Sequence, residues 1–331
     1  MTLPTGTITM QEVNVELGNS PSFSTISLND SDVRTLASIP SGTISMDDLR
    51  GQSAFTFVGG TPYPNGLYVF SSSGPYSYTA VIPTSIEVLI VGGGGNSLAP
   101  SGGRRGGGGG GGVRFLSIPI TGSGSGTITV GGGGSSSTAF GFTATRGGPT
   151  SVFGADPGGS GGGGGPTPAA PAIGGNGNSP PVSPPQGEDG GDWLGSPSSQ
   201  RGAGGGGGAD GSGFDPPSNT PIFPTRQHNG GAGGLGFQSP PIWNPVDPVG
   251  DNGYWGGGGG GSGNGSSTNN RGQVQNGGGG RGGLYDPSPS PVSPSNLAEN
   301  GQANTGGGAG GAGESPNPDV NGGSGVVIVR T

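Results

Sequence analysis

Three carboxylates that lie close together in the sequence, Glu188, Asp189 and Asp192, are the residues best suited to acid–base chemistry. A pair of carboxylates hydrolyses a glycosidic bond when one acts as the acid and the other as base or nucleophile. That chemistry requires a rigid cleft in which one carboxyl has a raised pKa. The surrounding sequence is rich in Gly and Pro and offers no apolar wall for such a cleft. We therefore expect that the protein is not an enzyme.

The chain lacks the residue types on which most other catalytic and metal sites depend. It has no Cys, no Lys and a single His, His228. Zinc sites, cysteine nucleophiles, P-loops and triads that need a second His are thereby excluded. No D-x-[DN]-x-[DN]-G calcium loop occurs either. We expect neither a metal nor a cofactor.

The charge balance argues against nucleic acid as a partner. The 11 basic residues, all Arg, are outnumbered by 19 acidic residues, and the pI is about 4.4. Only Arg104 and Arg105 are adjacent, whereas phosphate binding needs clustered cations. No stretch approaches the roughly 20 apolar residues of a membrane span, and residues 1–18 lack the features of a signal peptide. We expect a soluble, acidic protein.

Glycine is unevenly distributed along the 331 residues. Of the 86 Gly, 8 lie in residues 1–91 and the other 78 in residues 92–325. Apolar residues make up 26% of the chain, against about 45–50% in globular proteins, so a conventional large core is excluded. Composition alone would favour disorder. Collagen is excluded because runs such as Gly106 to Gly112 break its three-residue register.

Residues 1–53 contain a repeat of 18 residues, marked by Ile8, Ile26 and Ile44. In each copy a Ser or Thr is followed three residues later by an acid, which is the capping-box pattern or its Asp variant. The pairs are Thr9 with Glu12, Ser27 with Asp30, and Ser45 with Asp48. Three short helices should start there. The module either holds itself together by stacking its apolar residues or docks onto a larger assembly.

From Ala54 the pattern is that of β-strands, with aromatic and β-branched residues bounded by Gly, Pro and Asn-Gly. The expected strands are 55–58, 67–70, 76–79, 86–91, 113–120, 127–130 and 326–329. Strands 86–91 and 326–329 are the most continuously apolar and should be the central strands of one small β-sandwich. The residues between Val130 and Gly325 then form an insertion whose two ends lie close together.

The predicted fold is mainly β with irregular structure, in three parts. Residues 1–53 form the helical-repeat module, residues 54–154 with 322–331 the β-sandwich framework, and residues 155–321 an inserted glycine-rich region. Fixing a run such as Gly256 to Gly261 costs about 1–2 kcal/mol per residue. A bundle of polyproline II helices would offset this cost, because bare backbones approach closely enough for N–H···O and Cα–H···O contacts. The alternative is a flexible tail.

All three Trp of the chain lie in the segments between the glycine runs, together with the only His. Pro-stiffened loops lose little entropy on binding, and aromatic faces suit sugar rings or the rim of an outer-membrane protein. The candidates for an exposed binding surface are Trp193, Phe223, His228, Trp243 and Tyr285. The alternative is that aromatic residues are cover plates on the ends of the bundle. Trp255 and Phe214, directly beside glycine runs, fit that role better.

Two phrases of the repeat, TISLNDSDVRTLAS and SGTISMDDLRGQS, resemble the N-terminal modules of phage tail tip and tail fibre proteins. The resemblance covers residues 5–53. It implies a segment that attaches to a phage tail, with Ile8, Ile26 and Ile44 as candidate attachment residues.

Four ordered phrases, VLIVGGGG, TITVGGGG, TSVFG and GGSGVVIV, resemble the glycine-rich domain of phage tail fibres and tip adhesins. The resemblance covers residues 54–331. It implies polyproline II helices in the glycine runs and loops between them that form a receptor-binding tip. The runs concerned are 106–112, 161–165, 204–208, 256–261 and 277–280.

We therefore expect a virion protein that attaches to the phage tail and recognises the host surface. Its partners would be other tail or baseplate proteins and a host polysaccharide or outer-membrane protein. A homo-oligomer is expected, a trimer if it follows tail fibres, although related tips can be monomeric. The alternatives are a structural tail or capsid component whose glycine region is a spacer, and an ice-binding or surface-coating protein.

Overall fold

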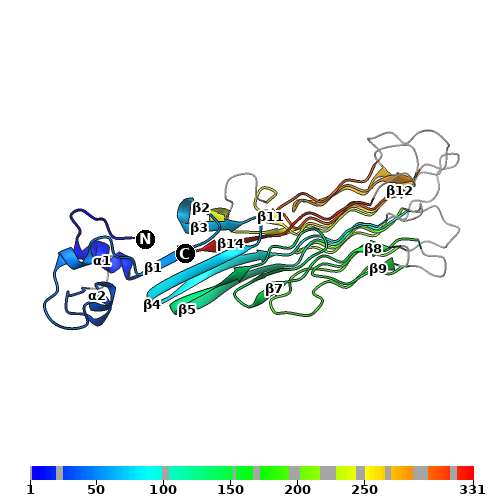
Figure 1. Cartoon of the computed structure of the whole chain (residues 1–331). Coiled ribbons are helices and arrows are strands. Elements are labelled where there is room, and N and C mark those ends of the chain that lie inside the picture. The colour runs from blue at the N-terminus through cyan, green and yellow to red at the C-terminus, as the bar shows by residue number, and fades with distance from the viewer. Residues whose placement is uncertain are drawn as a thin grey trace.

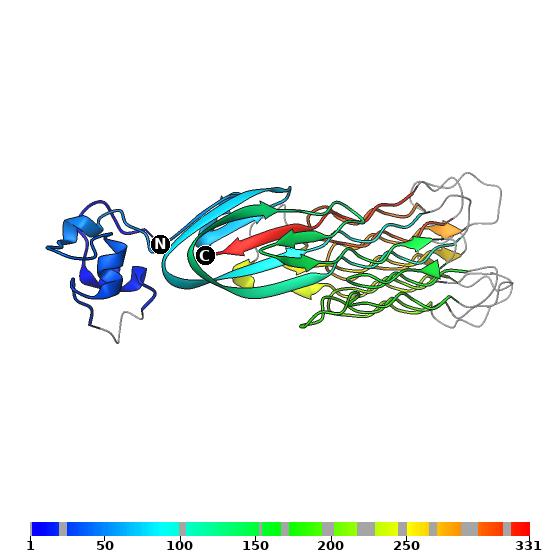
Figure 2. The ribbon, with the colours of Figure 1, turned by 60° about the horizontal axis from the view of Figure 1, so that its bottom comes forward.

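The computed structural model places a small helical module at one end of the molecule and glycine-rich segments at the other, with a β-sheet between them (Figure 1). It describes residues 2–19, 25–98, 104–151, 154–166, 172–193, 202–216, 229–243, 250–264, 270–285, 297–313 and 319–331. The glycine-rich segments run side by side away from the sheet (Figure 2).

The N-terminal module contains two α-helices and a 3-10 helix: α1 Met10–Glu16, α2 Ser31–Leu36 and η1 Met46–Leu49. In all three repeats the acid accepts a hydrogen bond from the backbone N–H of the Ser or Thr, at 2.7 Å for Thr9 and 2.8 Å for Ser27 and Ser45. Helices begin directly after Thr9 and Ser45, as expected. The second helix begins later, at Ser31, because Asp30 rather than Ser27 is its N-cap.

The three repeat isoleucines face the core of this module. Ile8 is buried, and Ile26 and Ile44 pack against the same cluster. The cluster also contains Val13, Leu17, Val33, Leu36 and Leu49. Their apolar surface is therefore used within the module, as the self-contained arrangement requires, and attachment through these three side chains stays a prediction.

The sheet has six antiparallel strands in the order β1-β4-β14-β3-β2, with β5 on β4. Their bounds are β1 Phe55–Val58, β2 Thr61–Tyr63, β3 Leu67–Phe70, β4 Gly74–Val91, β5 Val113–Ile128 and β14 Val326–Arg330; η2 Pro64–Gly66 precedes β3. Two expected strands merge into β4, which is irregular between Ala80 and Thr84. Strands β4 and β14 are both central, as expected, and they pair with each other. The six strands form one curled antiparallel sheet, and the sandwich stays a prediction.

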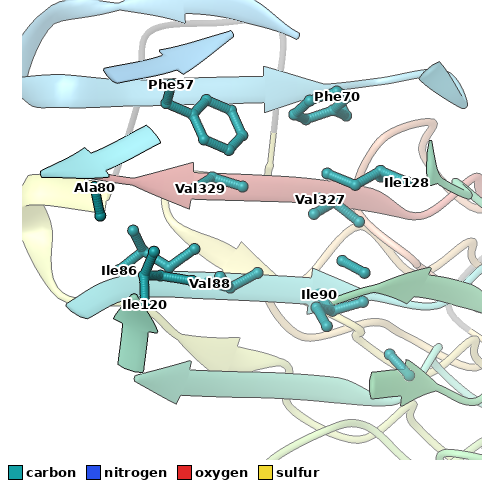
Figure 3. Packing of buried hydrophobic residues seen from close by; sticks show 12 residues of the cluster. Phe57, Phe70, Ala80, Ile86, Val88, Ile90, Ile120, Ile128, Val327 and Val329 are labelled. Carbon is teal, nitrogen blue, oxygen red and sulfur yellow. The ribbon is translucent and has the colours of Figure 1, made fainter. Parts of the chain in front are cut away.

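Each face of the sheet has its own apolar cluster. One face carries Ile86, Val88 and Ile90 of β4 beside Val327 and Val329 of β14 (Figure 3). The other carries Leu89, Val91, Val326 and Ile328. Alternation of side chains along a strand places successive residues on opposite faces. Continuously apolar sequences in β4 and β14 follow from burial on both sides.

The chain leaves the sheet and returns to it at neighbouring points. Gly325 donates its backbone N–H to the carbonyl oxygen of Gly131 at 2.8 Å, and Val326 pairs with Val91. The expectation that the two ends of the insertion lie close together is confirmed.

Short strand pairs and one 3-10 helix punctuate the inserted segments. They are β6 Ser137–Ala139 with β7 Phe142–Ala144, β8 Thr150–Ser151 with β9 Gly154–Ala155, β10 Phe237–Gln238 with β11 Tyr254–Trp255, β12 Gly263–Asn264 with β13 Leu284–Tyr285, and η3 Pro241–Trp243.

Candidate functional site

The glycine segments are held together by backbone hydrogen bonds that change partner with every residue. Along residues 107–112, successive N–H groups donate to three different segments in turn, and every third residue returns to the same segment. The acceptors are Gly204 and Gly207, Ala309 and Gly306, and Gly148 and Thr145, at 2.7–3.0 Å. The direction of the N–H groups therefore repeats every three residues.

The carbonyl groups of the same segment accept from three further segments. Gly95, Gly163 and Gly259 donate to Gly109, Gly107 and Gly108, at 2.7, 2.8 and 2.9 Å respectively. The segment at 104–112 is thus surrounded by six others. They comprise residues 92–95, 145–148, 160–163, 204–207, 259–262 and 306–312.

No side chain fits between these backbones. A Cβ added to any residue from Gly106 to Gly111 would lie within 3.0 Å of a carbonyl oxygen of a neighbouring segment. Real Cβ atoms essentially never approach other atoms so closely. Glycine is therefore required here for close approach, and residues 106–111 cannot carry a functional side chain.

Functional side chains must therefore lie on the outside or at the ends of the bundle. Most of the described ranges of the glycine-rich segments end at the end farthest from α1 and α2, whereas the range that ends at Trp243 ends beside the sheet (Figures 1 and 2). Hydrogen bonds tie their terminal residues to one another, as between Trp193 and Ala172, Arg105 and Ala312, and Gly230 and Asn270. We call this the distal end.

Trp193 lies at the distal end, but its ring is not exposed. It is 0% exposed, its backbone N–H donates to the carbonyl of Ala172 at 2.8 Å, and its Nε1–H has no acceptor in the described part of the chain. The expectation of an exposed Trp193 is wrong, because the surrounding residues enclose its side chain completely.

Trp243 is also buried, at the opposite end of the segments, where it covers the sheet. Its ring meets Phe115 of β5 edge-on, with ring centroids 5.2 Å apart, and it belongs to the apolar cluster on that face. Trp255 lies in the same cluster and donates from Nε1 to the Ser239 Oγ at 3.2 Å. Trp255 is thus a cover plate, as expected, and Trp243 is one against expectation, because the sheet face needs covering.

The family model of a glycine-rich domain matches residues 71–331, from β4 to the last residue of the chain. The chain belongs to this glycine-rich domain family. No curated protein matches the chain.

Among the described residues of the glycine-rich domain, two large apolar side chains are more than half exposed, and neither is a predicted binding residue. Phe214, expected to be a cover plate, is 53% exposed, and Ile173 is 74% exposed. Phe223 and His228 lie outside the described residues, and only the backbone of Tyr285, in β13, is described. The exposed surface expected from Trp193 and Trp243 is therefore not formed by those two residues.

The clustered carboxylates of the glycine-rich domain bind backbone amides of adjacent segments. Asp189 Oδ1 accepts from Gly177 N–H and Asp192 Oδ1 from Gly174 N–H, both at 2.7 Å. Asp215 Oδ1 accepts from the Asp192 N–H at the same distance. These carboxylates accept hydrogen bonds from backbone N–H groups at the surface of the bundle, as carbonyl oxygens of neighbouring segments do in its interior.

Two arginines are buried at the distal end of the glycine-rich domain. Arg271 pairs with Glu299 at 2.9 Å and donates to the carbonyl of Gly282. Arg105 is 4% exposed and donates to the carbonyls of Leu98 and Arg104, and among the described residues it makes no ion pair. Burial lowers the pKa of the Arg105 guanidinium.

Sequence analysis missed Gln186, which closes the central segment at its sheet end. Its side chain accepts from Thr145 N–H at 2.8 Å, and its backbone carbonyl accepts from Val113 N–H, also at 2.8 Å. The only signal in the sequence is an isolated long amide after a Pro-rich stretch, which does not identify the partners.

Neither a metal centre nor a membrane span is found in the described ranges. There, no three His, Cys, Asp or Glu side chains are grouped so that they could hold a metal ion. None of the helices in the same ranges is long and apolar enough to cross a membrane.

Proposed function

We propose that the protein is a component of a phage tail that attaches through its N-terminal module and recognises the host cell surface at the distal end. The parts are those expected from sequence, residues 1–53, residues 54–154 with 322–331, and residues 155–321. Recognition is adsorption without covalent chemistry, and several copies on one virion would strengthen weak contacts by avidity.

The observation that carries this proposal is the polarity of the molecule. The N-terminal module lies at one end, and most of the described ranges of the glycine-rich domain end at the other. The sequence-based candidates Phe223 and His228 follow the described range 202–216 in the sequence and precede the range 229–243. An elongated molecule with different chemistry at its two ends suits a link between a virion and a cell.

A regular backbone in the glycine segments would give the molecule the rigidity that such a link needs. The polyproline II helix has three residues per turn, and the hydrogen-bond direction along residues 107–112 repeats with that period. We propose that the glycine segments are polyproline II helices packed with six neighbours around the central one. The same rigidity also supports the second candidate function, a structural spacer within a tail fibre.

Competition for host adsorption by the purified full chain distinguishes the two functions. Phe223→Ala with His228→Ala should weaken competition at least about tenfold if the distal end binds a receptor. Phe142→Ala is the matched control, because Phe142 is 37% exposed and lies on β7, at the sheet end. Absence of competition by the unmodified chain would contradict the receptor-binding function and favour the spacer.

A further inference from the structure

Strand β5 forms a long outer edge of the sheet. Among the described strands it pairs only with β4, along Val113–Ile128 (Figure 1). An unpaired edge presents backbone N–H and C=O groups to which another strand can add, and proteins usually block it with charges, proline or a covering segment.

The residue that follows β5, Thr129, shows which backbone groups of the strand face away from β4. Thr129 and Thr138 each donate a backbone N–H to the carbonyl of the other, at 2.9 and 2.8 Å, so the N–H and C=O groups of Thr129 face away from β4. In a strand these groups face the same side at every second residue. The polar backbone groups of Ser123, Ser125 and Thr127 therefore also point outward, away from β4.

Blocking devices occur in only one half of this edge. In the first half Val113 N–H is bonded to Gln186, and Pro119 has no N–H to offer. In the second half, Thr121 to Thr127, the sequence contains neither a charge nor a proline. The residues of this second half are exposed, except for Gly124, which is half-buried.

The two faces of this open half differ. On one face, the aromatic rings of Tyr76 and Tyr78 lie over Gly126 and Gly124 and fill the space that side chains would occupy. On the other, Ser123 lies beside Thr79, its Oγ donating to Thr79 Oγ1 at 3.3 Å. The open half therefore carries glycines covered by tyrosine rings on one face and a row of hydroxyl groups on the other.

The sequence of the open half, Thr-Gly-Ser-Gly-Ser-Gly-Thr, reads the same in both directions about Gly124. We propose that this edge binds the same edge of a second copy, antiparallel, about a two-fold axis through Gly124. Ser123 of each copy then lies opposite Ser125 of the other, and the outward backbone groups of both residues pair. Hydroxyl residues face hydroxyl residues, which is a favourable cross-strand combination.

A second copy fits this edge better than an unrelated strand for two reasons. Because the sequence is a palindrome, antiparallel pairing with a second copy places Thr opposite Thr, Ser opposite Ser and Gly opposite Gly. An unrelated strand would not give this match. No charge lies in the segment, so the two-fold axis brings no like charges together. Such a contact is isologous and closes at two copies. This inference goes beyond the proposed function and does not depend on it.

The proposed contact involves only the segment Thr121 to Thr127 of each copy. It is small, because specific stable interfaces bury about 800 Å² on each partner. We expect a dissociation constant on the order of 0.1 mM. Sedimentation equilibrium of the full chain, from about 1 µM to about 0.5 mM, should show a monomer–dimer equilibrium. Self-association is measured without host cells, so its failure is distinct from failure of receptor binding.

Paired charge variants test the register. Ser123→Lys with Ser125→Lys places like charges opposite each other and should raise the dissociation constant at least about tenfold. Ser123→Lys with Ser125→Glu places opposite charges together and should restore it to within about threefold. Ser77→Lys with Thr79→Lys is the control, because these residues pair with Ser125 and Ser123 from β4, one strand inside the edge.

Urea unfolding of every variant checks that the exposed substitutions leave the fold intact. A monomer throughout the concentration series would overturn the proposal. It would also be overturned by an oligomer of any size, a trimer included, that the paired lysines leave unchanged. Equal weakening by both edge variants would contradict the two-fold register.

Discussion

Gly110 donates its backbone N–H to the carbonyl oxygen of Gly207 at 2.8 Å. The two residues are far apart in the sequence, and neither has a side chain that would keep their backbones apart. A Cβ on Gly110 would meet the carbonyl oxygen of Gly256, which belongs to yet another segment. Three segments thus meet at one residue, and each contributes only backbone atoms.

Gly110→Ala should destabilise the protein by about 3 kcal/mol, because overpacking a rigid interior forces backbones apart. The midpoint of urea unfolding measures this loss. Gly132→Ala is the matched control, since no atom lies within 4 Å of a Cβ added there. Equal stability of the two variants would contradict the close packing of the central segment.

Amide hydrogen exchange should be slow throughout Gly107 to Gly112 and Gly256 to Gly261, because each of these N–H groups has a carbonyl acceptor in another segment. Gly6 serves as the reference for rapid exchange, since it is an exposed glycine in the N-terminal module. Exchange at Gly107 to Gly112 as fast as at Gly6 would show that the glycine segments do not form a stable bundle.

Trp243→Ala should cost about 3–5 kcal/mol of unfolding free energy, since it removes a ring that is 1% exposed and packs on Phe115. Host adsorption, measured well below the unfolding temperature, should be unchanged. Loss of adsorption at unchanged stability would restore Trp243 as a receptor-binding residue.

The N-terminal module should loosen in acid. Hydrogen bonds from the Ser45 side chain and backbone hold the pKa of Asp48 below its ordinary value of 3.8. A lowered folded-state pKa adds stability that is present above the ordinary value and is lost as the pH falls through the folded-state value.

Amide exchange at Ser45, compared with that of Asp48→Asn at each pH, measures this effect. The difference between the two proteins should be present at pH 6 and should shrink below about pH 3.8. A difference that stays constant with pH would contradict the role of the Asp48 carboxylate.

The local elements could be predicted from sequence because their signals are local. Thr9 and Ser45 begin helices since the acid three residues later bonds back to them, and the apolar run at 86–91 lies within the central strand β4. The order of the strands in the curled sheet could not be predicted, because strand order depends on contacts between distant residues.

The exposure of individual aromatics was the least predictable property. Trp243 and Phe214 both lie among Gly and Pro, yet one is buried and the other exposed. The difference arises because Trp243 meets a sheet face that needs covering, whereas Phe214 lies on a surface segment. The sequence around Trp243 and Phe214 does not indicate which of the two side chains is buried. Glycine itself gives no indication of which segments become neighbours.

The central segment of the bundle is bonded to its neighbours through backbone atoms, so its contacts do not depend on particular side chains. The bonds of residues 107–112 use groups that every amino acid possesses, and they require that these six residues themselves carry no side chain. The sequence that connects two glycine segments can then change or lengthen without repacking the interior around residues 107–112. Variation in these connecting sequences is therefore uncoupled from the stability of that interior.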